Sequence, residues 1–242
     1  MSCFGDPEGV KQTFYSKPEV CSLRQRIRVF LLLIAASAVP TAAQQVGKIE
    51  ALGALTDASV SAGVRQVLEP KGYRISLDGT TVAAEIWLRK DMPAQPKKET
   101  ADVIYDRMVE STLVGVLRWP QASSDYRGQP VPAGFYTLRY ELIPNDGNHL
   151  GVAPSRDFLL MIPANSDTDP SQTLKVQEVI ALSRQASGTK HPAPLSMLQP
   201  EGGTAAAITK DDEDHYIFSA GIKLASGEDM PLALVVKGTA QQ

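Results

Sequence analysis

The sequence predicts a mainly β protein, an antiparallel β-sandwich of the Ig-like or jelly-roll kind with one or two peripheral helices. The chain of 242 residues contains 17 prolines and 18 glycines, more than a helical bundle tolerates. Its apolar residues fall into about seven short segments separated by turn residues, as in sandwich folds. Hydrophobic residues make up 43% of the chain, which is enough to bury a sizeable core.

Each strand is predicted from alternating or continuous apolar residues. The clearest case is the segment 136–142, in which tyrosines and leucines alternate with Thr137, Arg139 and Glu141, so that one face is apolar and the other polar. The other predicted strands are 73–77, 81–88, 112–119, 158–162, 215–224 and 232–237. Helical spacing predicts two helices, a short one between the N-cap Asp57 and Pro70, and another over 172–186.

The amino-terminal region predicts export. The segment 24–28 carries three arginines, the apolar run 29–36 follows, and small residues continue to Ala43. This order is typical of a secretory signal peptide, and we expect cleavage near Ala43, with Ala42 as the alternative. The apolar run is about half of the ~20 residues that a membrane-spanning helix needs. A periplasmic or secreted protein is therefore expected, with no membrane span in its mature form.

The domain organisation follows from this leader. We expect residues 1–43 to form a leader with the signal peptide, and residues 44–242 to form a single β-sandwich domain in which 164–200 is a candidate loop and helix insertion. The polar segment 1–22 has no core pattern, so translation is predicted to begin later, near Val20 or Leu23.

Composition excludes several chemistries. Both cysteines, Cys3 and Cys21, lie in the leader, so the mature chain is expected to have no thiol for catalysis, disulfide bonding or metal binding. The formal net charge of −3 offers no basic surface for a phosphate backbone, so nucleic acid is not an expected partner. The chain contains no G-x-S-x-G nucleophile motif and no phosphate-binding glycine loop. An enzyme is therefore not the favoured interpretation.

One turn carries a candidate metal site. Asp146 and His149 lie in the turn after the alternating strand, and Asp157 and His191 are the nearest further ligand types. Asp-Gly and the neighbouring asparagines are explained by turn geometry alone, and no second histidine stands at a ligand spacing such as H-x-H. We therefore expect no cofactor, with a divalent metal bound by these four residues as the alternative.

The segment 165–169 matches the beginning of a calcium-binding loop but not the rest of it. Asn165, Asp167 and Asp169 match the first three ligand positions. Pro170 stands where such a loop needs glycine, and Val176 stands where it needs glutamate. The sequence therefore favours an ordinary loop over a calcium site.

The candidate ligand-binding residues are Trp119, Tyr126 and Arg127. Trp119 ends a predicted strand beside Pro120, and Tyr126 and Arg127 lie on a loop, where the tyrosine is expected to be exposed. Aromatic rings and arginine are enriched at binding surfaces, and a ring face offers stacking area to a glycan. Burial in the core is the alternative for the tryptophan, because large aromatic residues in strands are usually buried.

The segment GQPVPAGFYTLRYEL, residues 128–142, resembles the G-x-x-(V/L)-P-A-G-x-Y-x-L lead-in to a strand of several families of exported bacterial β-sandwich proteins, many of them uncharacterised. The matching residues are Gly128, Pro132, Ala133, Gly134, Tyr136 and Leu138. The resemblance implies Ig-like or jelly-roll sheets and a role in accessory, assembly or binding functions.

These observations favour an exported, non-catalytic β-sandwich protein that binds a glycan or a protein partner in the cell envelope. The first alternative is a metal-dependent hydrolase that uses His149 with nearby carboxylates. The second alternative is a purely structural envelope protein.

Overall fold

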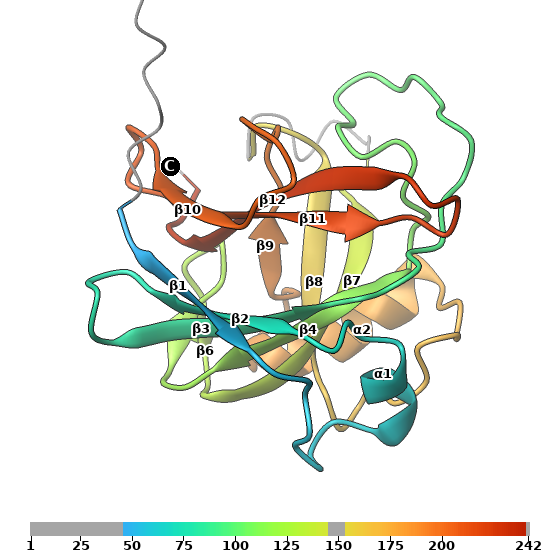
Figure 1. Ribbon diagram of the computed structural model, residues 1–242. Helices are drawn as coiled ribbons and strands as arrows, with labels where there is room; N and C mark the ends of the chain where they lie inside the picture. Colours follow the sequence, from blue (N-terminus) through green and yellow to red (C-terminus); the bar gives the residue numbers. More distant parts are fainter. Residues whose placement is uncertain (1–45, 145–152, 241–242) are drawn as a thin grey trace, which may run out of the picture. The chain divides into compact units, whose positions relative to one another are not determined.

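The computed structural model describes residues 46–144 and 153–240, which form a mainly β structure with a seven-stranded antiparallel sheet, a three-stranded sheet and two helices (Figure 1). The larger sheet has the strand order β1-β2-β3-β4-β7-β8-β9. Its strands are β1 (Lys48–Leu52), β2 (Gly72–Ser76), β3 (Val82–Leu88), β4 (Leu113–Trp119), β7 (Gly134–Leu142), β8 (Asp157–Pro163) and β9 (Pro194–Ser196). The predicted fold class, a β-sandwich with few helices, is confirmed.

The smaller sheet faces the larger one across the core. Its strands are β10 (Ala207–Lys210), β11 (Tyr216–Lys223) and β12 (Asp229–Lys237), and a separate two-stranded ribbon consists of β5 (Ser123–Ser124) and β6 (Pro130–Val131). In Figure 1 the three-stranded sheet lies above β1 to β4, while β7, β8 and β9 rise between the two levels. A single antiparallel bridge from Met197 to Leu234 joins the β9 end of the larger sheet to β12.

Strand alternation places one face of β7 in this core. Tyr136, Leu138 and Tyr140 belong to the main hydrophobic cluster between the two sheets. The opposite face carries polar side chains, as the alternation predicts. These side chains are nevertheless buried, because α2 (Val176–Ser187) and the loop before it pack against that face of the sheet.

The helices differ in part from the prediction. The first helix, α1 (Ala62–Gln66), is shorter than expected, and its N-cap is Ser61, whose hydroxyl accepts a hydrogen bond from the Val64 N–H. Asp57 is not the cap, because its carboxylate accepts from the backbone and hydroxyl of Ser59 instead. Neither described helix has both the length and the apolar character that crossing a membrane requires.

The interval 164–200 contributes to the larger sheet. It contains α2, which packs on Leu160 and Ile162 through Val179, and it ends in β9, which pairs with β8. Gly188 terminates α2 in the left-handed conformation, with φ of 65°, which glycine adopts without steric cost. The chain then returns directly to the sheet edge and leaves α2 packed on β8.

Candidate ligand-binding groove

A groove of about 530 Å³ runs along α2 on the outer face of the larger sheet. This volume lies within the range of known ligand sites, roughly 300–1,000 Å³. Its lining is mainly apolar. The apolar residues that form its floor and helical wall include Leu142, Ile143, Phe158, Leu160, Val176 and Ile180.

The floor and one wall follow from strand and helix periodicity. Phe158 and Leu160 lie two residues apart on β8 and therefore point to the same outer face. Val176, Ile180 and Arg184 are four residues apart on α2, a spacing that places them in one row along the helix. This row forms the wall of the groove and ends in a positive charge.

The opposite wall is a loop tied to the sheet edge and to the carboxyl-terminal segment. The Tyr126 N–H donates to the Pro194 carbonyl at 2.8 Å, and the Ala240 N–H donates to the Tyr126 carbonyl at 2.8 Å. The buried carboxylate of Asp125 accepts from the Arg127 and Gln129 N–H groups, each at 2.9 Å. These bonds hold the loop in place, so the Tyr126 and Arg127 side chains border the groove from a fixed backbone.

Glu141 is the unusual residue of the groove. Its side chain is buried, with only 4% of the residue exposed, and neither carboxyl oxygen has a hydrogen-bond partner. Burial, assisted by the negative charge of Glu110, raises the pKa of Glu141 to about 7, against the opposing effects of the positive charge of Arg139 and of the nearby Ser111 N–H, which is bonded to the Tyr140 carbonyl. A buried polar group without a partner is costly, so this carboxyl is the polar feature of the groove that most requires explanation.

Glu141→Gln is expected to remove a pH dependence of stability. The unfolded carboxyl ionises near pH 4.5 and the folded one near pH 7, so the folded state holds the extra proton between these values. The stability conferred by this proton is fully present below pH 4.5. It decreases by about 3 kcal/mol as the pH rises from 4.5 through 7.

Urea unfolding at pH 4 and pH 8 measures this effect. At pH 8 the glutamine variant should be more stable than the wild type by about 3 kcal/mol, while at pH 4 the two should agree. An unchanged pH slope in the variant would show that Glu141 ionises normally.

Positive charges gather at the end of the groove where α2 finishes. Arg184 lies in the last turn of α2, Lys190 and His191 follow that turn, and Arg127 lies on the facing loop. All four are exposed. Within the described ranges, no ion pair involves Arg127, Arg184 or Lys190. We call Arg127, Arg184 and Lys190 the cationic end of the groove.

The candidate metal ligands do not form a described metal site. Asp157 faces the core, where its carboxylate accepts from the Ile104 N–H at 2.8 Å, the Tyr105 N–H at 3.0 Å and the Tyr140 hydroxyl at 2.7 Å. His191 is exposed beside the groove instead. Asp146 and His149 lie outside the described residues. Among residues 46–144 and 153–240, no three metal-ligating side chains come together.

The three candidate ligand-binding residues have different environments. Arg127 is exposed and borders the groove, as a binding residue would. The expected exposure of Tyr126 is wrong: its ring borders the groove but is only 3% exposed, because it packs against Phe158 and His215. Trp119 lies in the core, where its indole N–H points to the Met161 sulfur at 3.3 Å, and it does not reach the groove.

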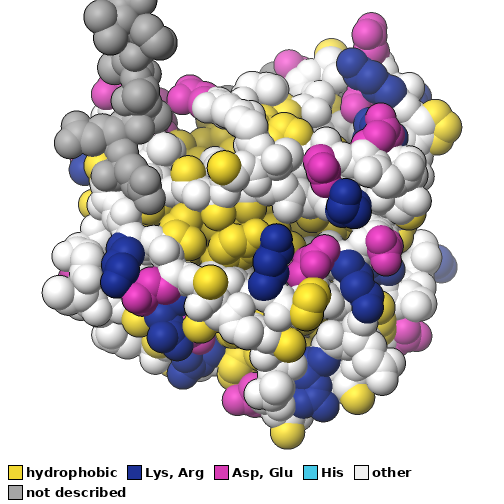
Figure 2. Space-filling view, viewed as in Figure 1, with side chains coloured by type: hydrophobic (Ala, Val, Ile, Leu, Met, Phe, Trp, Pro, Cys, Tyr) yellow, Lys and Arg dark blue, Asp and Glu magenta, His cyan; other side chains and the backbone are white. Residues whose placement is uncertain are grey.

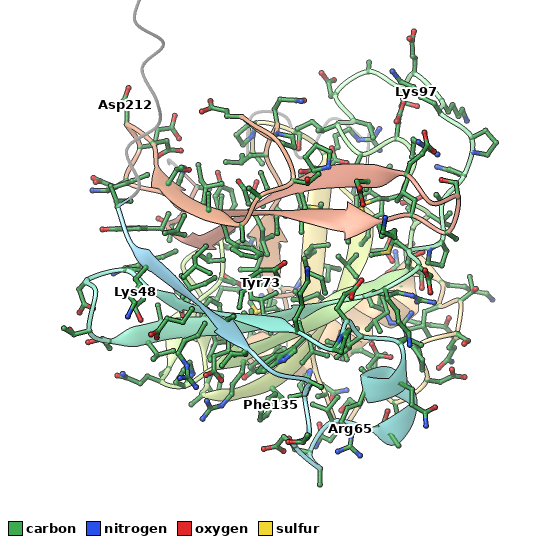
Figure 3. The ribbon with its side chains drawn as sticks, in the orientation of Figure 1. Lys48, Arg65, Tyr73, Lys97, Phe135 and Asp212 are labelled. Carbon is green, nitrogen blue, oxygen red and sulfur yellow. The ribbon has the colours of Figure 1, made fainter. Side chains whose placement is uncertain are left out.

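A second, smaller hollow lies between the two sheets. Figure 2 shows apolar side chains gathered between the sheets on this face, and Figure 3 labels Tyr73 among them. The Tyr73 ring packs against Phe218 with a centroid distance of 5.3 Å. The hollow has a volume of about 170 Å³ and a largely polar lining that includes Lys71, Thr204 and Asp229. The groove along α2 is larger and more apolar, and is the better candidate site.

The fold and its main hollow define a β-sandwich protein with an amphipathic groove on the outer face of its larger sheet. Comparison of the chain with protein-family models, with curated proteins and with solved structures gives no match. The groove residues themselves therefore carry the functional argument.

Proposed function

We propose that the protein is a non-catalytic binding protein of the cell envelope, and that the groove along α2 holds a segment of a protein partner. The observation that carries this proposal is the combination of an apolar floor, an unpartnered buried carboxyl and three cations in one groove. Apolar clefts with a few convergent polar groups and a perturbed pKa are the usual form of binding sites.

A protein segment suits the groove better than a glycan does. The aromatic rings that border it, Tyr126 and Phe158, are almost completely buried and offer little ring face for stacking on a sugar. Partly exposed aliphatic side chains, Leu142, Ile143 and Ile180, supply the accessible surface instead. Aliphatic contacts of this kind match the apolar side chains of a peptide laid in a groove beside a helix.

Val176 and Val109 provide a matched test of this assignment. They are the two exposed large hydrophobic residues of the described chain, 38% and 37% exposed, and only Val176 borders the groove. Binding of the neutral apolar fluorophore N-phenyl-1-naphthylamine is expected to weaken at least about fivefold in Val176→Glu, because the probe then contacts a charged wall. Val109→Glu is expected to bind the probe as the wild type does.

The substitution at Val176 is chosen to preserve the fold. Val176 opens α2, and an acidic side chain in the first turn of a helix interacts favourably with the helix dipole. Loss of probe binding in Val176→Glu with an unchanged circular dichroism spectrum supports the proposal. Equal binding by both variants, or no binding by the wild type, contradicts it and favours a purely structural envelope protein.

Export is part of the same proposal. Its support is the order of arginines, apolar run and small residues over 24–43, which is typical of a cleaved signal peptide. Amino-terminal sequencing of the protein recovered from the periplasm or the medium is expected to begin at Gln44. A product that keeps residues 29–43 and remains in the cytosol would contradict export.

A further inference from the structure

We propose that the groove recognises two opposite charges on the bound segment, an acidic group at the cationic end and a lysine or arginine at Glu141. This inference rests on the proposed function and specifies the partner's chemistry. It is carried by the positions of Glu141 and the three cations at opposite ends of α2. The distance between the ends is set by the helix, because eight residues from Val176 to Arg184 rise about 12 Å.

Glu141 lies at the end where α2 begins. The Ser111 N–H donates to the carbonyl of the neighbouring Tyr140 at 2.8 Å, and the Ser111 hydroxyl accepts from the Leu174 N–H at 2.8 Å, two residues before α2. The Glu141 side chain is therefore beside the first turn of α2, which is consistent with Val176 and Glu141 lining the same groove.

The cations lie at the end where α2 finishes. Arg184 is in the last turn, and Lys190 follows the terminating Gly188. The loop with Arg127 reaches the same end, because the Gln129 side-chain amide donates to the Pro192 carbonyl at 2.9 Å. An anionic group of the ligand is favoured here, where positive side chains have no described carboxylate partner.

The nearest arginine on the sheet does not neutralise Glu141. Arg139 is fully committed elsewhere: its guanidinium forms two hydrogen bonds with the Asp167 carboxylate, at 2.8 and 2.7 Å, and further bonds with backbone carbonyls. The other charged neighbour is Glu110, which is itself negative. An incoming ammonium or guanidinium group would therefore supply the hydrogen bonds that both Glu141 oxygens lack.

An extended peptide has the right length to reach both ends. Successive residues of a strand advance about 3.3 Å, so the first and fifth residues are about 13 Å apart. A segment with lysine first, three apolar residues and aspartate fifth places its charges at Glu141 and at the cationic end. The apolar residues between them lie over Phe158, Leu160 and Ile180.

Four synthetic peptides test the inference by titration calorimetry at pH 8, where the Glu141 carboxyl is mostly ionised. The first is acetyl-Lys-Leu-Val-Leu-Asp-amide. The others replace its lysine by norleucine, replace its aspartate by asparagine, or place its lysine directly before its aspartate, so that the two charges can no longer reach both ends. The first peptide is expected to bind at least about tenfold more tightly than each of the others, because each of them loses or misplaces a charge pair.

Two variants assign the two charges to their sites. Glu141→Gln should lose the preference for lysine over norleucine and keep the preference for aspartate over asparagine. Arg184→Gln should weaken the second preference at least about threefold and keep the first, since Arg127 and Lys190 remain. Lys97→Gln is the control, because Lys97 is an exposed lysine on the loop marked in Figure 3 and does not border the groove.

The outcomes separate the inference from the proposed function. Equal binding of all four peptides overturns the two-charge inference. Tighter binding of dodecanoate, an apolar chain with a single negative charge, than of the first peptide overturns it as well. In either case, probe binding that depends on Val176 and not on Val109 would still support a binding groove. Loss of that dependence overturns the proposed function itself.

Discussion

Replacing Asp167 by asparagine is expected to lower the free energy of unfolding by about 3–5 kcal/mol. Asp167 and Arg139 form an ion pair in which both side chains are almost completely buried. The carboxylate also accepts from the Thr137 hydroxyl at 2.7 Å. Removing the negative charge leaves the Arg139 guanidinium buried beside a neutral group, which is far less favourable than the intact pair.

The pair also determines the position of α2. Asp167 lies on the segment between β8 and α2, and Arg139 donates to the carbonyls of Asp169 and Gln172 on the same segment at 2.9 and 2.8 Å. We therefore expect amide hydrogen exchange in 164–187 to accelerate most in Asp167→Asn. Denaturant unfolding measures the total loss.

An exposed ion pair is the control for Asp167. Glu50→Gln removes the same charge from the pair with Lys48, in which both side chains are largely exposed, and should leave the free energy of unfolding nearly unchanged. A similar small loss in Asp167→Asn would show that the buried pair does not stabilise the sheet and α2 as described. The double variant Arg139→Met with Asp167→Leu should recover part of the lost stability, because no charge is then left buried.

Asp157→Ala is expected to lower the free energy of unfolding by about 3–5 kcal/mol. Three buried donors lose their acceptor at about 1–3 kcal/mol each, and local rearrangement recovers part of this sum. The donors are the N–H groups of Ile104 and Tyr105 and the hydroxyl of Tyr140. Burial and the neighbouring carboxylate raise the pKa of Tyr140, so its hydroxyl keeps the proton that it donates. Tyr140→Phe should cost less, about 1.5–3 kcal/mol, because only the one hydrogen bond to the carboxylate is removed.

The comparison variant is Asp57→Ala, which removes an exposed carboxylate that accepts bonds from Ser59 and should cost far less stability than Asp157→Ala. Thermal unfolding of the three variants orders these losses. A stability loss in Asp157→Ala no larger than that in Asp57→Ala would contradict the structural role of Asp157.

Strand periodicity predicted the central strands and missed the short ones at the edges. β2, β3, β4, β7 and β8 carry enough alternating or continuous apolar residues to be identified from sequence, as do β11 and β12. The edge strand β1 has five residues, β9 has three and begins with a proline, and β10 has four. These three strands are defined by backbone pairing with longer neighbours, and a local pattern of side chains does not reveal such pairing.

The groove was only partly predictable. Tyr126, Arg127 and His191 were selected from sequence and all border it, although Tyr126 is buried. Glu141 was assigned to a polar face, since alternation separates two faces of a strand but does not tell what covers each one. The cover comes from α2, more than thirty residues later, so burial of Glu141 has no local signal in the sequence.

Chemical-shift mapping of amide resonances tests the proposed binding along α2 most directly, with acetyl-Lys-Leu-Val-Leu-Asp-amide added to the isotope-labelled protein. We expect the largest shifts in 176–184 of α2, in 158–160 of β8 and at Arg127, all of which border the groove. Saturable shifts confined instead to the hollow around Lys71, Tyr73 and Asp229, or no saturable shifts at all, would contradict binding along α2.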